Sequence, residues 1–323
     1  MPSRADELID RRRMRRKLTF WRVAAIAIAT VAIVAAGSRL YRRDFAVPSA
    51  AQIAKVKISG AITENDDLLD ELERLRKSHA VKGLILEINS PGGTTVGGEA
   101  LYDEVRRIAA DKPVVAEIGT LAASAAYMVA SAADHIVAHR TSIVGSIGVL
   151  IEYPDVTGLM DKLGIKLEEI KSAPLKAEPS PFNPTTDQER AMVRKLILDS
   201  YNWFVGIVAE RRKLSRDQAL ALSDGSIFTG RQGVANKLVD EIGGERQAVA
   251  WLGTKGVDPK LNVIEWETDK SRGWLFSRSA ARAIAHWLGA PEEAGGLLRR
   301  VVGEGMFLDG LQSVWHGGLA RPE

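Results

Sequence analysis

The segment Gly83-Leu84-Ile85-Leu86-Glu87-Ile88-Asn89-Ser90-Pro91-Gly92-Gly93-Thr94 joins an apolar run to a glycine turn. An apolar run bounded by Gly and Pro is typical of a buried strand. A helix is expected over 98–110, because Leu101, Val105 and Ile108 fall on one face and charged residues on the other. A strand, a turn and a helix in this order indicate a βαβ unit with a right-handed crossover. The predicted fold class is therefore α/β.

The same alternation extends on both sides of this segment. Strands are expected at 55–58, 113–118, 135–137 and 168–170. Helices are expected at 65–78, 124–133 and 186–213, with shorter elements at 215–222, 230–236 and 245–252. The pattern predicts one domain over 55–254, with a linker before it at 39–54. A C-terminal extension follows at 255–323, and its role is open. For its tail from Thr268 we expect packing rather than an oligomer contact or a surface membrane contact.

Composition and charge exclude several classes of protein. The chain has 323 residues and no cysteine, which excludes disulfides, thiolate metal sites and a cysteine nucleophile. Residues 1–43 hold eleven Lys/Arg and three Asp/Glu, a net charge of +8, whereas residues 44–323 carry a net charge of −5. A nucleic-acid-binding domain needs a basic body or stripe. We therefore expect no nucleic-acid partner.

The N-terminal residues have the pattern of a membrane anchor. Residues 1–17 form a basic tail that would lie in the cytoplasm, and residues 18–38 are almost wholly apolar. A membrane-spanning helix needs about 20 residues, so this stretch suffices. The more basic near flank places the domain outside the cytoplasm. A cleaved signal peptide ending near Ser49-Ala50-Ala51 has the same layout, but that site lies far from the apolar stretch, so we expect an uncleaved single-pass anchor.

Three short segments carry residues suited to chemistry. The turn at 89–94 leaves backbone N–H groups where a ligand can approach closely, although Pro-Gly-Gly is usually only a turn. Ser124 stands at a strand-to-helix junction among small residues, either as a helix cap or as a nucleophile. Lys176 lies beside apolar residues in an irregular stretch, 171–179, either as a solvated side chain or as a neutral base.

Together these segments resemble peptidase family S49, the short single-unit bacterial signal peptide peptidases, within the wider Clp-protease/crotonase fold. The matching motifs are Asn-Ser-Pro-Gly-Gly at 89–93, Ala-Ala-Ser at 122–124, Gly-Ser-Ile-Gly at 145–148, the lysine segment at 171–179, and the closing segments at 228–233 and 238–243. The resemblance covers residues 55–252. It implies repeated ββα units, with an N-terminal transmembrane helix before them.

The resemblance also implies the members of the site. Ser124 and Lys176 would form a Ser-Lys dyad that acts through an acyl-enzyme. Ser146 would orient the lysine amine. The backbone N–H groups of Gly93 and Ala125 would form the oxyanion hole.

A lysine base must be held neutral, by burial and by the absence of a carboxylate partner. Lys176 fits this demand best, provided that Glu178 points away from it. Lys171, which we expect to point to solvent, is the alternative. His135 and His139 are conceivable bases, but we expect both to be structural.

The resemblance implies no metal and no organic cofactor. Its substrates would be cleaved signal peptides, and its chains would form a homo-oligomeric ring in which neighbours can share one active site. The protein would sit in the bacterial cytoplasmic (inner) membrane, with the catalytic domain on the outer or periplasmic face. Three alternatives stay open: a Ser-Lys membrane protease of the type that partners stomatin-like proteins, a crotonase-type acyl-CoA enzyme, and a non-catalytic crotonase-fold scaffold.

Overall fold

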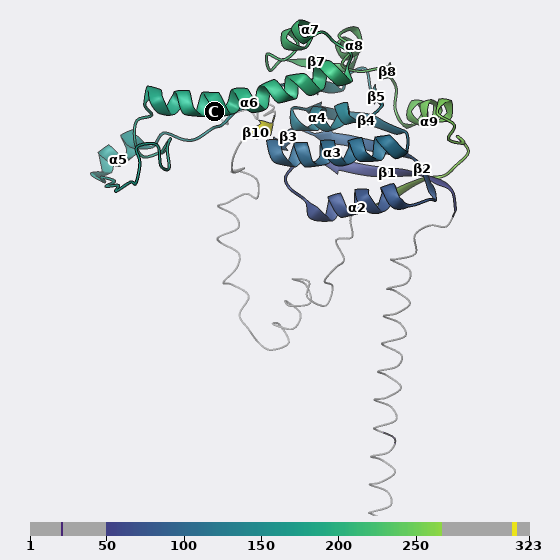
Figure 1. Ribbon diagram of the computed structural model, residues 1–323, viewed down its shortest axis with the longest axis horizontal. Helices are drawn as coiled ribbons and strands as arrows, with labels where there is room; N and C mark the ends of the chain where they lie inside the picture. Colours follow the sequence, from purple (N-terminus) through teal and green to yellow (C-terminus); the bar gives the residue numbers. More distant parts are fainter. Residues whose placement is uncertain (1–20, 22–49, 267–311, 315–323) are drawn as a thin grey trace, which may run out of the picture. The chain divides into compact units, whose positions relative to one another are not determined.

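The computed structural model describes residues 21, 50–266 and 312–314. The chain divides into two compact units, residues 1–50 and 51–323, and every element labelled in Figure 1 belongs to the second. Its strands are β1 (Gln52–Ser59), β2 (Val81–Ser90), β3 (Gly92–Thr94), β4 (Val114–Ala123), β5 (His135–Ala138), β6 (Ile143–Gly145), β7 (Ile227–Thr229), β8 (Glu241–Ile242), β9 (Val263–Trp266) and β10 (Gln312–Val314). Its helices are α2 (Asp66–Lys77), α3 (Thr95–Asp111), α4 (Ala125–Ala132), α5 (Thr157–Leu163), α6 (Asp187–Arg211), α7 (Arg216–Ala221), α8 (Gly230–Ala235) and α9 (Glu245–Thr254).

An eight-stranded sheet forms the centre of this unit. The strand order is β7-β6-β4-β2-β1-β9, and β5, which also pairs with β8, joins the sheet at β4. The pairs in this sheet are parallel except that of β6 with β7. The first half of β4 pairs with β5 and its second half pairs with β6. The sheet therefore divides along β4, and the end of β4 lies beside β6.

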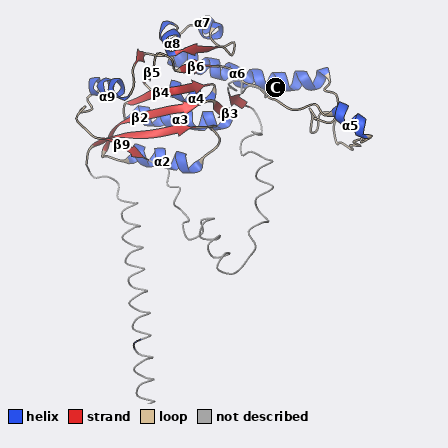
Figure 2. Cartoon of the chain, turned by 180° about the vertical axis from the view of Figure 1, so that it is seen from behind, coloured by secondary structure: helices blue, strands red, loops and turns tan. Residues whose placement is uncertain are grey.

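Alternate side chains of the sheet face two different layers of helices. In β2, Leu84, Leu86 and Ile88 belong to a large core that also contains residues of α2, α3, α4 and α6. Ile85 belongs to a smaller core on the other face, with residues of α9. Figure 1 shows α2, α3 and α4 in front of the sheet, and Figure 2 shows the strands from behind. Because both faces are covered, β2 is a nearly continuous apolar run.

The α/β class predicted from the sequence is confirmed, and the helices expected at 65–78, 98–110 and 186–213 are present as α2, α3 and α6. The strand expected at 168–170 is wrong, because residues 165–170 are exposed and form no strand. Glu169 instead bonds to Lys171 and Asn183. Three residues with no neighbouring strand cannot satisfy their backbone groups as a ladder.

The anchor expected at 18–38 lies outside the described residues, apart from Trp21. Among the residues that the structure describes, no helix is both long enough and apolar enough to cross a membrane. The repeated ββα units, the cytoplasmic tail at 1–17 and the boundaries at 38/39, 54/55 and 254/255 stay predictions.

Candidate active site

Ser124 occupies a strained turn between β4 and α4. Its backbone angles are φ 59° and ψ −123°, a left-handed φ that side chains with a Cβ rarely adopt. Its N–H donates to the carbonyl of Gly145 at 2.8 Å, and its own carbonyl accepts from the N–H of Met128 at 3.0 Å. Such strain costs about 1–3 kcal/mol and persists only where the surroundings enforce it. A sharp strand-to-helix turn of this kind is one way in which folds present a nucleophilic serine.

Helix α4 holds this turn in place because it is anchored along its whole length. All eight of its residues are buried. The hydroxyl of Tyr127 donates to the carbonyl of Leu238 at 2.8 Å, within the closing segment of the domain. At the other end of the helix, Arg106 and Arg211 donate to the carbonyls of Ala132 and Ser131. The residue after Ser124 is thus fixed on a rigid element.

Gly93 lies in β3, where no side chain would fit. The N–H of Thr94 donates to the carbonyl of Ile62 at 2.8 Å, and the N–H of Ile62 donates to the carbonyl of Gly92 at 2.8 Å. A Cβ on Gly93 would lie 1.8 Å from the Ile62 carbonyl oxygen. Backbone groups alternate in direction along a strand, so the Gly93 N–H points away from Ile62.

The N–H of Ala125 lies in the first turn of α4. Ala125 is the first residue of α4, and first-turn N–H groups have no carbonyl partner inside their own helix. β3 packs against α4. The strand that contains Gly93 therefore contacts the helix that Ala125 begins.

Ser146 is brought to the same place by β6. Ala123 and Gly145 are paired across β4 and β6, and Gly145 accepts the N–H of Ser124. Gly145 has φ 101°, and a Cβ there would lie 2.9 Å from Phe228 and from the carbonyl of Ser226. Ser146 then donates its N–H to that same carbonyl at 2.7 Å. The residue next to Ser146 is therefore bonded directly to the serine turn.

The residues described so far, Gly93, Ser124, Ala125 and Ser146, are called the rim below. The lysine segment, 171–179, is built differently. Lys171, expected to point to solvent, has a side chain only 19% exposed and contacts the carboxylates of Glu169 and Glu178. Hydrogen bonds to Glu169 and Glu178 raise the pKa of Lys171, and the bond from Lys171 lowers the pKa of Glu178. The expectation for Lys171 is wrong, because the turn at 172–177 folds it back onto its acidic neighbours.

Lys176 is exposed at the tip of that turn. Among the described residues its ammonium has no hydrogen-bond or ion-pair partner, so the single chain does not bring it to Ser124. Glu178 is held by Lys171 and not by Lys176, which meets the condition set from the sequence. The burial that a neutral lysine needs is absent in the single chain.

Exposed apolar side chains surround the lysine turn in the sequence. Among them Ile170 is fully exposed and Leu163 is 64% exposed. The others are Leu159, Ile165, Leu167, Phe182, Leu196 and Leu198. No residue of α5 is buried. Exposed apolar side chains that form one contiguous patch would mark an interaction surface.

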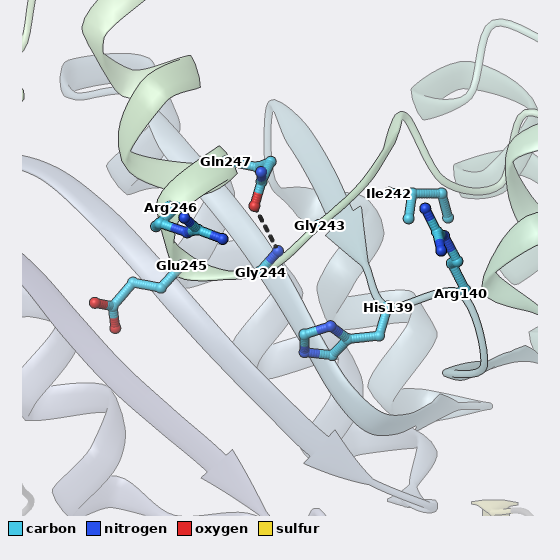
Figure 3. Close-up of a pocket in the computed structure, with 8 residues that line it drawn as sticks. All are labelled: His139, Arg140, Ile242, Gly243, Gly244, Glu245, Arg246 and Gln247. Carbon is cyan, nitrogen blue, oxygen red and sulfur yellow. Dashed lines mark hydrogen bonds between the residues drawn. The ribbon is translucent and has the colours of Figure 1, made fainter.

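The two histidines considered as bases lie on the face of α9. His135 stacks on Trp251 with a ring separation of 4.9 Å, and its Nε2 lies 3.4 Å from Glu241. His139 lines a pocket with Gly244 at the start of α9 (Figure 3), where Gln247 accepts the Gly244 N–H. The large core that contains α4 lies on the opposite face, so neither ring reaches Ser124.

A group of charged side chains lies on the sheet face that α9 covers, and the sequence analysis did not predict it. Lys55 lies 2.6 Å from Glu87, 2.9 Å from Glu245 and 4.0 Å from Glu117. Burial lowers the pKa of Lys55, but the hydrogen bonds to Glu87 and Glu245 outweigh it and leave that pKa raised. Burial also raises the pKa of Glu117. Within the described residues, no cluster of three or more His, Asp or Glu could hold a metal ion.

Comparisons with known proteins point to one family. The profile described as "Peptidase family S49" matches residues 106–257. A protein of Methanocaldococcus jannaschii provisionally named as a protease is 41% identical over 207 residues, which are 64% of this chain and 66% of that protein. A protein of Enterococcus faecium provisionally named signal peptide peptidase SppA is 30% identical over 74% of this chain and 73% of its own length. Protease 4 of Haemophilus influenzae is 31% identical over 74% of this chain, but this is only 42% of that protein.

Proposed function

The chain belongs to peptidase family S49 and is a serine peptidase, and from this premise we propose a membrane-anchored endopeptidase with a Ser124/Lys176 dyad. Ser124 Oγ attacks the scissile carbonyl and gives its proton to Lys176 Nζ. The tetrahedral oxyanion accepts hydrogen bonds from the backbone N–H groups of Gly93 and Ala125. Lys176 then protonates the leaving amine, and water hydrolyses the acyl-enzyme.

The observation that carries this proposal is the convergence of three chain segments on one serine. The residue preceding Ser146 is bonded to the turn at Ser124, and β3, which contains Gly93, contacts the helix that this turn begins. Each has a conformation that a generic turn does not need: φ 59° at Ser124, φ 50° at Ser146 and no room for a Cβ at Gly93. Strain gathered in this way favours a functional site.

The base comes from a neighbouring chain in this proposal. Lys176 is exposed, and apolar side chains around it in the sequence are exposed as well. Packing that surface on a second copy would bury the amine and favour its neutral form. Lys171 keeps Glu178 engaged, so no carboxylate would hold Lys176 in its charged form. Ser146 would orient the amine in the assembled ring.

The substrates we propose are cleaved signal peptides. The printed name of the Enterococcus faecium relative supports this class. The apolar stretch 18–38 and its basic flanks support a single-pass anchor in the cytoplasmic membrane, with the peptidase domain of Clp-protease/crotonase type on the outer face. The Ser-Lys protease that partners stomatin-like proteins remains the second candidate, since it would use the same dyad.

Hydrolysis of a fluorogenic peptide with a small apolar residue before the cut tests the proposal. The full chain in detergent is compared with Ser124→Ala, Lys176→Ala and the matched control Lys171→Ala, with a serine-directed fluorophosphonate as a second readout. We expect Ser124→Ala to lose hydrolysis and labelling, and Lys176→Ala to lose at least about 10²-fold in kcat. Lys171→Ala should keep most of its activity. Activity retained in Lys176→Ala, or lost mainly in Lys171→Ala, would exclude Lys176 as the base.

A further inference from the structure

A strand from the far end of the chain pairs with the strand that contains Gly93. β10 (Gln312–Val314) forms a separate two-stranded antiparallel sheet with β3 (Gly92–Thr94). The register places Ser313 opposite Gly93, with Gln312 opposite Thr94 and Val314 opposite Gly92. Figure 1 shows β10, in yellow, beside β3 and near the start of α4. More than two hundred residues of chain separate these two strands.

The pairing uses the edge of β3 toward which the Gly93 N–H points. The N–H of Thr94 and the carbonyl of Gly92 are both bonded to Ile62. Directions alternate along a strand, so the N–H and carbonyl of Gly93 face the other edge, where Ser313 lies. The backbone donor assigned to the oxyanion hole is therefore the group that faces β10.

We infer that the segment 312–314 is an internal competitor of the peptide substrate, held along β3 by strand addition. An extended peptide that joins a free strand edge binds through main-chain hydrogen bonds, which any sequence can make. The tail has this form: an extended segment, antiparallel to β3, with no requirement on its side chains. A Gly93 N–H bonded to the tail cannot at the same time bond the oxyanion of a reacting peptide.

The inference rests on the proposed function, because it takes Gly93 as part of the substrate edge. Its consequence is a site that is closed by its own chain and opened when the tail leaves. A ladder of three residues is short, and each net backbone hydrogen bond contributes little to stability. The tail can therefore be displaced by a substrate that makes more contacts along the same edge.

Two substitutions of Ser313 distinguish the effect of its backbone N–H from the effect of its side chain. Ser313→Pro removes the N–H and disfavours the ladder, whereas the matched control Ser313→Ala keeps both. In the full chain, we expect Ser313→Pro to raise kcat/KM for the fluorogenic peptide about fivefold or more, mainly through a lower KM. Ser313→Ala should match the wild type. Equal activities of the proline and alanine variants would overturn the inference.

Hydrogen exchange gives a readout that does not depend on hydrolysis. In the full chain carrying Ser124→Ala, the amide of Gly93 should exchange slowly, and adding Ser313→Pro should speed its exchange about fivefold or more, whereas the amide of Thr94 is bonded to Ile62 and should not change. Unchanged exchange at Gly93 would overturn the tail pairing. Faster exchange in a protein that shows no Ser124-dependent hydrolysis would support the pairing and refute the proposed function, so the two failures are distinguishable.

Discussion

The rim around Ser124 and the segment around Lys176 are built in opposite ways. At the rim, every residue of α4 is buried, the serine turn is bonded to β6, and Gly93 is fixed by Ile62. In the lysine segment, α5 has no buried residue and Ile170 is fully exposed. The segment around Ser124 is packed within the single chain, and the segment around Lys176 is exposed in it. This difference is what the proposal of a site shared between chains rests on.

The sharpest way to break the rim is a methyl group at Gly93. Gly93→Ala places a Cβ 1.8 Å from the Ile62 carbonyl oxygen, so β3 must move and the oxyanion donor with it. We expect hydrolysis to fall by about 10²–10³-fold. The matched control is Gly158→Ala in α5, where nothing lies within 4 Å of the added Cβ. Circular dichroism and hydrolysis of both variants would check this, and equal losses in the two would contradict the contrast between the regions.

A charged residue among the exposed apolar side chains near Lys176 tests the lysine segment. Ile170→Asp should prevent neighbouring chains from covering this surface, because burying an unpaired carboxylate is costly. We expect smaller assemblies in sedimentation velocity and a loss of about 10² in hydrolysis, the contribution of a missing general base.

The control for this variant is Ile264→Asp on β9, where the side chain is 38% exposed and distant in sequence from the lysine turn. It should leave both assembly and hydrolysis near the wild-type level. An Ile170→Asp protein that assembles and cleaves normally would show that the apolar surface has another role.

A substitution of Ser146 tests the proposed contact between the rim and the lysine amine. Ser146→Ala should lower kcat about tenfold, the worth of one oriented hydrogen bond to the lysine amine. If Ser146 donates to the neutral amine, its loss also raises the pKa of the base, so the acidic limb of the kcat profile should move to higher pH. Ser172→Ala, an exposed serine in the lysine segment, is the control. A lower kcat with an unmoved pH profile would indicate a purely structural role in the turn.

The smallest effect belongs to the Lys171–Glu178 pair. Its hydrogen bond lowers the pKa of Glu178, so its contribution to stability is present above the ordinary pKa of a glutamate and is lost as the pH falls through the lowered value. Thermal melts of Glu178→Gln should lie slightly below wild type at neutral pH and converge with it in acid. The effect is small because Lys171 keeps Glu169 as a partner after the change. A difference in melting temperature that stays constant with pH would contradict this assignment.

The sequence predicted the rim better than the lysine segment. Apolar periodicity predicted α3, and the capping residues Thr186 and Glu189 predicted the start of α6. The small residues before and after Ser124 predicted a strand-to-helix junction, which α4 confirms. The pairing of β10 with β3 had no signal, because three residues carry no periodicity and their partner is far away in the chain. The strand at 168–170 failed for a related reason: local alternation cannot tell a paired strand from an exposed segment. The burial expected for Lys176 is absent in the single chain, because its apolar neighbours in the sequence do not fold over it.

The most direct test of the shared site mixes two inactive proteins. Ser124→Ala retains the lysine, and Lys176→Ala retains the serine, so a ring containing both has some sites with one of each across a chain boundary. Mixed at equal amounts and reassembled, the two variants should recover about a quarter of wild-type hydrolysis, since one neighbour pair in four has the correct order. Mixed rings, identified by native mass spectrometry, that recover no activity would place serine and lysine in the same chain and contradict the account.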